Sequence, residues 1–171
     1  ITSRSFSQGA STISQQLIKN PHLSGDKTIK RKLSEIKLTK KLEKKYSKEQ
    51  ILEMYLNTIY FGHNCYGLES AAEFYFGTTA DKLTLEQSAT VVGLLTSPNN
   101  YSPFKNPERC IKRRNTVLKC MLDCEFIDED TYEKTAALPL SAKENSTFGG
   151  AAGYLSAVFD ELEAVSYTHL T

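Results

Sequence analysis

Residues 27–48, KTIKRKLSEIKLTKKLEKKYSK, are the stretch that decides how the rest of this chain folds. Ten basic residues and two acidic ones give the stretch a net charge of +8. Because the whole 171-residue chain carries only +1, all the other residues together sum to −7. No Gly or Pro interrupts the stretch, and Lys, Leu, Glu and Ile are adequate to good helix formers. We therefore predict one long basic helix.

Projected onto a helix, the stretch shows two apolar strips on nearly opposite sides, made of Ile29, Leu33 and Ile36 and of Leu38 and Leu42. Arg31 and Glu35 lie in the second strip, one turn apart. An ordinary Arg31–Glu35 pair on a solvated helix face explains this spacing. Alternatively, Glu35 is a working carboxylate in a basic cleft that is built for an anionic substrate. Periodicity does not decide between the two.

Composition indicates one globular domain with a real core, because 40% of the residues are hydrophobic and 24% are charged. No apolar run in the sequence is long enough to cross a bilayer. The three His residues are scattered, and the four Cys residues show no zinc-site spacing. We expect the cysteines to be small buried apolar residues, with a disulfide as the alternative that the spacing does not decide.

Cap signals predict further helices on both sides of the basic one. Ser11 or Thr12 starts a short helix that ends near residues 20–21, and Ser47 opens a capping box for a helix that ends by Gly62. Four more helices are expected. The first covers residues 68–76, and the second follows a capping box at residues 84–87. The third runs from the Asn106 cap to residue 121, and the fourth runs from the Asp128 cap to residue 137. Every element reads as helical, so the predicted fold class is all-α.

The C-terminal part reads differently from the rest. Residues 1–150 form the expected domain, and residues 151–164 are expected to begin a linker toward another domain. The tail at residues 165–171, VSYTHLT, fits no helix pattern. It is similar to the translation of a sequencing-library transposon-end adapter, and we expect it to be non-native.

Three groups of residues suggest a site for a phosphate-bearing sugar. The first is Gln15, Gln16 and Lys19, and the second is Arg31, Lys32 and Glu35. The third is the block Asn106-Pro107-Glu108-Arg109 running into Lys112-Arg113-Arg114-Asn115. Amides hydrogen-bond to sugar hydroxyls, and Lys and Arg bind a pyrophosphate. A carboxylate beside them suits acid–base chemistry on a sugar hydroxyl.

Longer blocks carry a family resemblance: QGASTISQQLIKN at residues 8–20, RKLSEIKLTKKLEKKYSKEQILEMYLNTIYFG at 31–62, YGLESAAEFYFG at 66–77, SPNNYSP at 97–103 and NPERCIKRRNTVLKCM at 106–121. Over residues 5–163 the chain resembles the peptidoglycan glycosyltransferase domain of class A penicillin-binding proteins and monofunctional transglycosylases. The resemblance implies a lysozyme-like, two-lobed helical fold. It also implies a place at the extracytoplasmic face of the bacterial cell membrane, with the cell-wall synthesis machinery as partner.

The implied reaction polymerises lipid II onto a growing glycan strand through β-1,4 links, with inversion and with release of undecaprenyl pyrophosphate. Glu35 matches the second catalytic carboxylate of the family. The matching substrate contacts are Gln15, Gln16, Lys19, Lys27, Arg31, Lys32 and Arg114, with Arg113 as the alternative to Arg114. A divalent cation, Mg²⁺ or Mn²⁺, at the pyrophosphate is chemically sensible, although no ligand cluster in the sequence demonstrates it.

The first family motif, E-D-x-x-F-x-x-H-x-G, with the general-base Glu, is expected upstream of Ile1 and is absent from this sequence. We therefore expect this chain alone to be inactive. Its last segment resembles the approach to a transpeptidase domain, which implies a bifunctional parent, yet no S-x-x-K occurs here.

Two other functions fit parts of the sequence. A basic helical module could bind an anionic membrane or a nucleic acid. Confinement of the positive charge to one helix argues against nucleic acid as the partner. A lysozyme-like peptidoglycan hydrolase would share the fold, but it needs no cluster of cations for a pyrophosphate.

Overall fold

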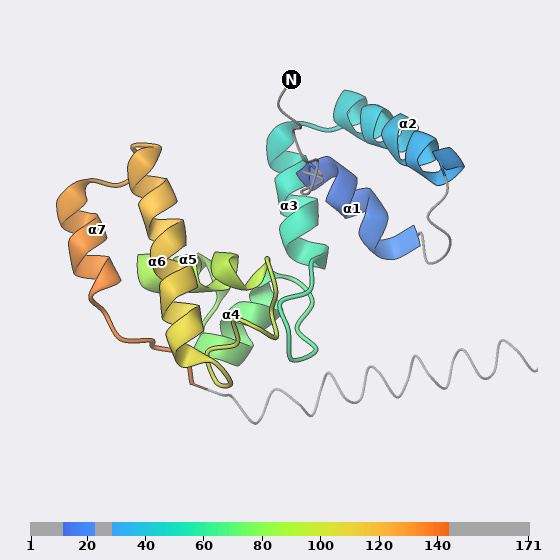
Figure 1. The fold of residues 1–171 in the computed structure, drawn as a ribbon. Helices are drawn as coiled ribbons and strands as arrows, with labels where there is room; N and C mark the ends of the chain where they lie inside the picture. The colour runs from blue at the N-terminus through green and yellow to red at the C-terminus, as the bar shows by residue number, and fades with distance from the viewer. Residues whose placement is uncertain (1–11, 23–28, 144–171) are drawn as a thin grey trace, which may run out of the picture. The chain divides into compact units, whose positions relative to one another are not determined.

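The computed structural model describes residues 12–22 and 29–143. For residues 19–22 and 29–31 it describes the backbone alone. Within these residues the chain is helical, with no β-strand and one isolated bridge between Tyr60 and Tyr66. The elements are α1 (Ile13–His22), α2 (Ile29–Lys45), α3 (Lys48–Thr58), α4 (Leu68–Phe76), η1 (Ala80–Lys82), α5 (Leu85–Leu94), α6 (Pro107–Asp123) and α7 (Glu129–Ala136) (Figure 1). The prediction of an all-α fold is confirmed.

The chain divides into two compact units at the boundary between Ile59 and Tyr60. Unit 1 contains α1, α2 and α3, and α1 packs against both of the other helices (Figure 1). Unit 2 contains the remaining helices, and α6 packs against both α5 and α7. No described helix is both long enough and apolar enough to span a membrane.

The predicted capping boxes are both present. The Ser47 hydroxyl accepts from the Gln50 N–H at 3.3 Å while the Gln50 amide oxygen accepts from the Ser47 N–H at 2.9 Å. Thr84 and Gln87 form the same pair of bonds at the start of α5. Each box satisfies two N–H groups that the first turn of a helix leaves without partners.

Other helix ends agree in part with the sequence. Asp128 caps α7 by accepting from the Thr131 N–H at 2.8 Å, and hydrogen bonds from Thr131 lower the pKa of the Asp128 carboxyl. The prediction of an Asn106 side-chain cap is wrong, because that side chain donates to the Asn99 carbonyl at 3.4 Å and makes no cap bond. Pro107 does begin α6.

Unit 2 holds most of the described core. Residues with less than 2% exposure include Phe61, Tyr75, Val91, Leu94 and Leu118. Cys65 and Cys110 are buried, as predicted, whereas Cys120 and Cys124 are exposed, so the prediction of burial is wrong for these two; all four are free thiols.

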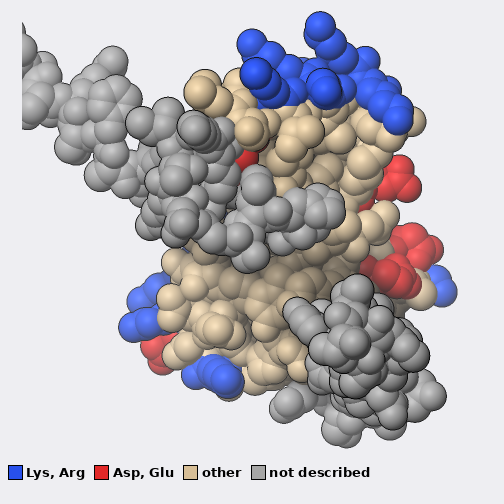
Figure 2. Space-filling model, turned by 90° about the vertical axis from the view of Figure 1, so that its right-hand side faces the viewer, with Lys and Arg blue, Asp and Glu red and all other residues tan. Residues whose placement is uncertain are grey.

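The helix α2 does not place its apolar strips inward. Leu33, Ile36 and Leu38 are 56%, 37% and 48% exposed, while Glu35 and Thr39 are buried at 3% and 6% exposure. Lysine side chains of this helix gather at the surface in Figure 2, and the described ones are exposed at Lys32, Lys37, Lys40, Lys41, Lys44 and Lys45. Leu42 of the second strip is partly exposed, so three of the four described strip residues lie at the surface.

Candidate active site

Glu35 is the buried carboxylate at the centre of the site in unit 1. Its residue is 3% exposed, on a helix whose other described residues are mostly exposed. One turn later, the Thr39 hydroxyl donates to the Glu35 carbonyl at 2.8 Å, so both buried positions lie on the same face of α2. The interpretation that places Glu35 on a solvated helix face is wrong, while its pairing with Arg31 stays a prediction because the Arg31 side chain lies outside the described part.

Lys32 is the described cation beside this carboxylate. Its Nζ lies 3.7 Å from Glu35 Oε2, and the Lys32 side chain is 56% exposed while that of Glu35 is 4% exposed. The pair therefore has one solvated member and one buried member. A carboxylate removed from water in this way is stabilised by neighbouring cations and hydrogen bonds, and such environments are common at functional sites.

The two amides predicted from the sequence lie on α1, which packs against α2 and α3. Gln15 and Gln16 are both partly exposed, and the Tyr55 hydroxyl on α3 donates to Gln16 Oε1 at 3.1 Å. Burial raises the pKa of Tyr55, so its hydroxyl keeps the proton that this hydrogen bond needs. Because Tyr55 donates to the oxygen of the amide, the orientation of the Gln16 amide is fixed.

Sequence reasoning did not assign Tyr55 to this site. A signal existed, because Tyr55 follows Ile51 at the four-residue spacing of one buried helix face, and both residues are 5% exposed. A tyrosine on such a face needs a partner for its hydroxyl. What the sequence does not show is that Gln16, 39 residues away, is that partner.

Three predicted contacts cannot be placed. Lys27 lies outside the described residues, and Lys19 and Arg31 belong to α1 and α2 with side chains outside the described part. Their roles stay predictions.

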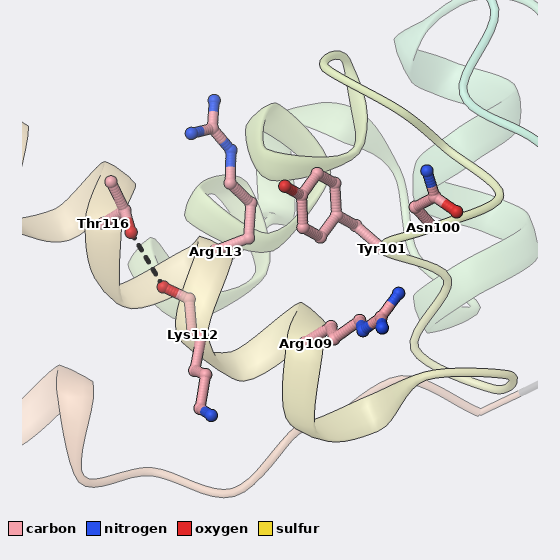
Figure 3. Close-up of a pocket in the computed structure, with 6 residues that line it drawn as sticks. All are labelled: Asn100, Tyr101, Arg109, Lys112, Arg113 and Thr116. Carbon is pink, nitrogen blue, oxygen red and sulfur yellow. Dashed lines mark hydrogen bonds between the residues drawn. The ribbon is translucent and has the colours of Figure 1, made fainter.

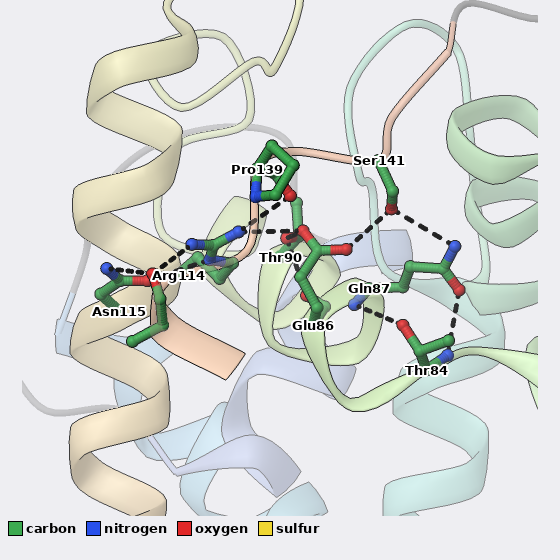
Figure 4. Close-up of polar contacts among 9 residues, drawn as sticks. Thr84, Glu86, Gln87, Thr90, Arg114, Asn115, Pro139 and Ser141 are labelled. Atoms are coloured by element: carbon green, nitrogen blue, oxygen red, sulfur yellow. Dashed lines mark hydrogen bonds and ion pairs between the residues drawn. The ribbon is translucent and has the colours of Figure 1, made fainter. Parts of the chain in front are cut away.

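Arg114 does not act as the predicted substrate contact in this structure, because it has no exposed surface. Its Nη1 donates to Glu86 Oε1 at 3.2 Å and to the Pro139 carbonyl at 3.4 Å, and its Nη2 donates to the Ala136 carbonyl at 3.0 Å (Figure 4). Asn115 Oδ1 accepts from its Nε at 2.9 Å. This network ties α6 to α5, to the end of α7 and to the segment after it, so the role of Arg114 is structural.

Arg113, the neighbour that the resemblance offered as an alternative, is partly exposed and lines an open pocket on unit 2. The two residues are adjacent on α6, and one step along a helix turns a side chain through more than a quarter of a circle. The same motif therefore sends one arginine into the core and the other to the surface.

In the described part of the chain, no group of three or more His, Cys, Asp or Glu side chains is placed to hold a metal ion. The described residues therefore do not fit a metal ion held by the protein alone.

Taken together, unit 1 presents a buried carboxylate, a neighbouring lysine and a fixed amide on packed helices. Such a set binds polar, negatively charged substrates and can support acid–base chemistry.

Comparison with known proteins identifies the family. The transglycosylase family model matches residues 1–122, and the chain belongs to the transglycosylase family. It therefore carries a transglycosylase domain, which is a glycosyltransferase domain.

The chain is 52% identical over 128 residues to penicillin-binding protein 1A/1B of Bacillus subtilis, which covers 74% of the chain and 14% of that relative. It is 42% identical over 171 residues to penicillin-binding protein 2a of Streptococcus pneumoniae, covering 96% of the chain and 23% of that relative. The chain thus spans less than a quarter of the length of these relatives.

A crystal structure of penicillin-binding protein 1A from Haemophilus influenzae is similar, with a TM-score of 0.55 and 36% identity. The match covers 61% of this chain and 16% of the other. The lysozyme-like, all-α fold class expected from the resemblance is confirmed.

Proposed function

We propose that this chain is part of a peptidoglycan glycosyltransferase. In this proposal the chain binds lipid II, and Glu35 is the second catalytic carboxylate of the enzyme. The observation that carries the proposal is the burial of Glu35 on a basic helix that packs against the helix of Gln15 and Gln16. Membership of the transglycosylase family and similarity to bacterial penicillin-binding proteins support the substrate class.

In the proposed reaction, the 4-hydroxyl of the acceptor GlcNAc loses its proton to a general base and attacks the anomeric carbon of the donor MurNAc. The bond from that carbon to the diphosphate oxygen breaks, and undecaprenyl pyrophosphate leaves with the electron pair. Attack opposite the leaving group inverts the configuration and gives the β-1,4 link. The family resemblance assigns the general base to the motif expected upstream of Ile1.

Each group in unit 1 has a place in this scheme. Lys32, with Lys19, Lys27 and Arg31, neutralises charge that builds up on the departing diphosphate. Glu35 holds Lys32 beside the leaving group and stabilises positive charge developing at the anomeric carbon. The Gln16 NH₂ group, fixed by Tyr55, donates to the sugar or its peptide.

A Mg²⁺ or Mn²⁺ ion enters the proposal only as a companion of the substrate. Diphosphate oxygens bind such ions directly, and the ion needs few protein ligands in that case. Chelation by EDTA followed by addition of either ion measures this dependence.

The membrane surface is the second partner that we propose. Leu33, Ile36 and Leu38 are exposed on α2 among its lysines, a combination that lets a helix lie on an anionic bilayer. A lipid-linked substrate is delivered from such a surface. The extracytoplasmic face of the bacterial cell membrane and contact with the cell-wall synthesis machinery belong to the same proposal.

The test is polymerisation of fluorescent lipid II by the chain joined to an N-terminal segment that carries the first motif. Glu35→Gln and Lys19→Ala are each expected to slow polymerisation by about 10² or more. Glu43→Gln is the matched control, because Glu43 is an exposed carboxylate on the same helix. Wild-type rates in both site variants would refute the assignment.

The same variants separate the rival functions. A peptidoglycan hydrolase would release muropeptides from finished cell wall, and Lys19→Ala would leave that release unchanged. A basic binding module would bind membrane or nucleic acid with a steep salt dependence, and Glu35→Gln would leave binding intact.

A further inference from the structure

A pocket of about 550 Å³ lies within unit 1, where the start of α1 and the end of α2 meet the first turns of α3. Most of its lining is apolar, and consists of Ile13, Ile51, Leu52 and the ring of Tyr46. The pocket that Arg113 lines on unit 2 is of the opposite kind, because polar and basic side chains surround it (Figure 3). The two pockets therefore suit different ligands.

Part of this apolar lining faces solvent. Ser14 and Ile51 are buried at 8% and 5% exposure, whereas Ile13 and Leu52 are 42% and 43% exposed. Apolar side chains that stand exposed beside a hollow mark a binding site, because a ligand removes them from water. An apolar ligand group therefore fits this pocket, whose volume is usual for a small-molecule site.

Positive charge gathers beside the same pocket. Lys48 is part of the lining, and Lys45 Nζ lies 5.2 Å from the centre of the Tyr46 ring. Both lysines are exposed, and no ion pair found among the described residues involves either of them. One carboxylate, Glu43, also lines the pocket, but Lys44 follows it directly, so the charge beside the pocket remains positive. Such a surface is complementary to an anion.

We propose that this pocket takes one acyl chain of an anionic phospholipid from the bilayer, with the headgroup beside Lys45 and Lys48. Such a lipid carries both features that the pocket matches, a hydrocarbon chain and a negative charge at its end. A hydrocarbon chain needs no hydrogen bonds. A segment of polypeptide in the same place would bury N–H and C=O groups against Ile13, Ile51 and Leu52, whose side chains offer them no partners.

The lipid tail of the proposed substrate fits the pocket less well. In the proposed function, the diphosphate binds beside Lys32 and Glu35. Glu35 and Lys45 are ten residues apart on α2, a separation of about 15 Å along the helix axis. A tail that began at this diphosphate would bring hydrocarbon into the pocket but would leave Lys45 and Lys48 without an anion. A phospholipid places its charge where these two lysines are.

This inference rests on the membrane contact that we propose for α2, and it names the site on unit 1 that takes a lipid chain. The two are separable, because the exposed Leu33 and Leu38 of α2 do not line the pocket. A soluble probe that forms no bilayer measures the pocket alone, whereas vesicles measure the pocket and the surface contact together.

Calorimetric titration of the full 171-residue chain with decyl phosphate, below the concentration at which it forms micelles, tests the pocket. Decanol is the uncharged companion probe. The pocket variant Ile13→Ser/Leu52→Ser is expected to bind both probes about tenfold or more weakly. Its matched control is Leu33→Ser/Leu38→Ser, which changes exposed apolar residues outside the pocket and is expected to stay within about twofold of the unmodified chain.

A second pair of variants tests the headgroup. Lys45→Gln/Lys48→Gln is expected to bind decyl phosphate about fivefold or more weakly and to bind decanol within about twofold of the unmodified chain. The matched control is Lys37→Gln/Lys40→Gln, which removes two exposed lysines of α2 that do not line the pocket. All of the changed side chains are exposed, and urea unfolding of each variant checks that the fold persists.

Co-sedimentation with phosphatidylcholine vesicles that contain phosphatidylglycerol tests the source of the chain. The pocket variant is expected to bind these vesicles about threefold or more weakly than the unmodified chain. Equal binding by the two would show that no phospholipid chain enters the pocket. Loss of both soluble probes in the pocket variant, with no effect of the lysine variant, would indicate a ligand whose charge lies elsewhere. Either result, or no saturable binding of decyl phosphate, overturns the proposal.

Discussion

Glu86→Gln tests whether the motif arginine Arg114 is structural. The substitution keeps the shape of the Glu86 side chain, which is 4% exposed, and removes only its charge. The guanidinium of Arg114, with no exposed surface, would then lie in the core 3.2 Å from a neutral amide. Ser141, which donates to Glu86 Oε2 at 2.7 Å, would face an amide as well.

The expected cost follows from this burial. Removing one partner from a buried ion pair costs roughly 3–5 kcal/mol, because the other charge stays desolvated without compensation. Glu86→Gln belongs at the lower end, about 3 kcal/mol, since the amide oxygen still accepts one hydrogen bond from Arg114. For a chain of this length, such a loss lowers Tm by about 10 °C.

Urea unfolding followed by hydrogen exchange of the α5 and α6 amides measures this loss where the pair lies. The double variant Glu86→Leu/Arg114→Met is expected to recover much of the stability, since it removes both charges from the core. Asp130→Asn is the control, because the Asp130–Lys134 pair is 70% and 74% exposed and is worth under about 1 kcal/mol. If Glu86→Gln and Asp130→Asn cost the same small amount, the structural role of Arg114 is refuted.

Three further predictions concern single residues. Tyr55→Phe removes the hydrogen bond to Gln16 and is expected to cost about 1 kcal/mol in urea unfolding and to slow lipid II polymerisation; unchanged polymerisation would show that Gln16 needs no anchor. Burial raises the pKa of the Cys110 thiol from 9.0 to about 11, so a thiol reagent is expected to modify exposed Cys120 first. Between those pH values the unfolded chain loses the Cys110 proton and the folded chain keeps it, so stability falls as pH rises, which urea titrations at several pH values measure. Gly62→Ala places a Cβ 3.0 Å from Tyr75 Oη at a φ of +93° and is expected to cost more than about 1 kcal/mol by thermal unfolding.

Local signals in the sequence predicted helix ends well. The capping box of Ser47 involves only Ser47 and Gln50, which are three residues apart, so the local sequence is enough to predict it. Asn106 shows the limit of that reasoning. Its side chain has a competing acceptor, the Asn99 carbonyl, and only the folded loop brings that carbonyl within reach.

The orientation of the arginine pair was not predictable in the same way. Arg113 and Arg114 have the same chemistry, so the motif alone does not predict which of the two contacts a ligand. Burial of Arg114 is decided by Glu86, 28 residues earlier, and by the carbonyls of Ala136 at the end of α7 and of Pro139 after it. Only tertiary packing selects which cation is enclosed and which one stays available at the surface.

The basic charge of the helix α2 was predicted correctly from the sequence, whereas its apolar residues do not pack as their pattern suggests. In a globular protein, Leu33 and Leu38 should be inside and Glu35 outside, because burial of apolar area stabilises the fold and burial of a carboxylate costs free energy. The structure has the reverse order. Exposure of the leucines has an explanation if α2 lies at a bilayer surface, since they then leave water by entering lipid. The buried carboxylate of Glu35 instead has Lys32 beside it within unit 1. Replacing Leu33 and Leu38 by Ser should therefore weaken vesicle binding without lowering the free energy of unfolding in water, whereas residues of an ordinary core would lose stability.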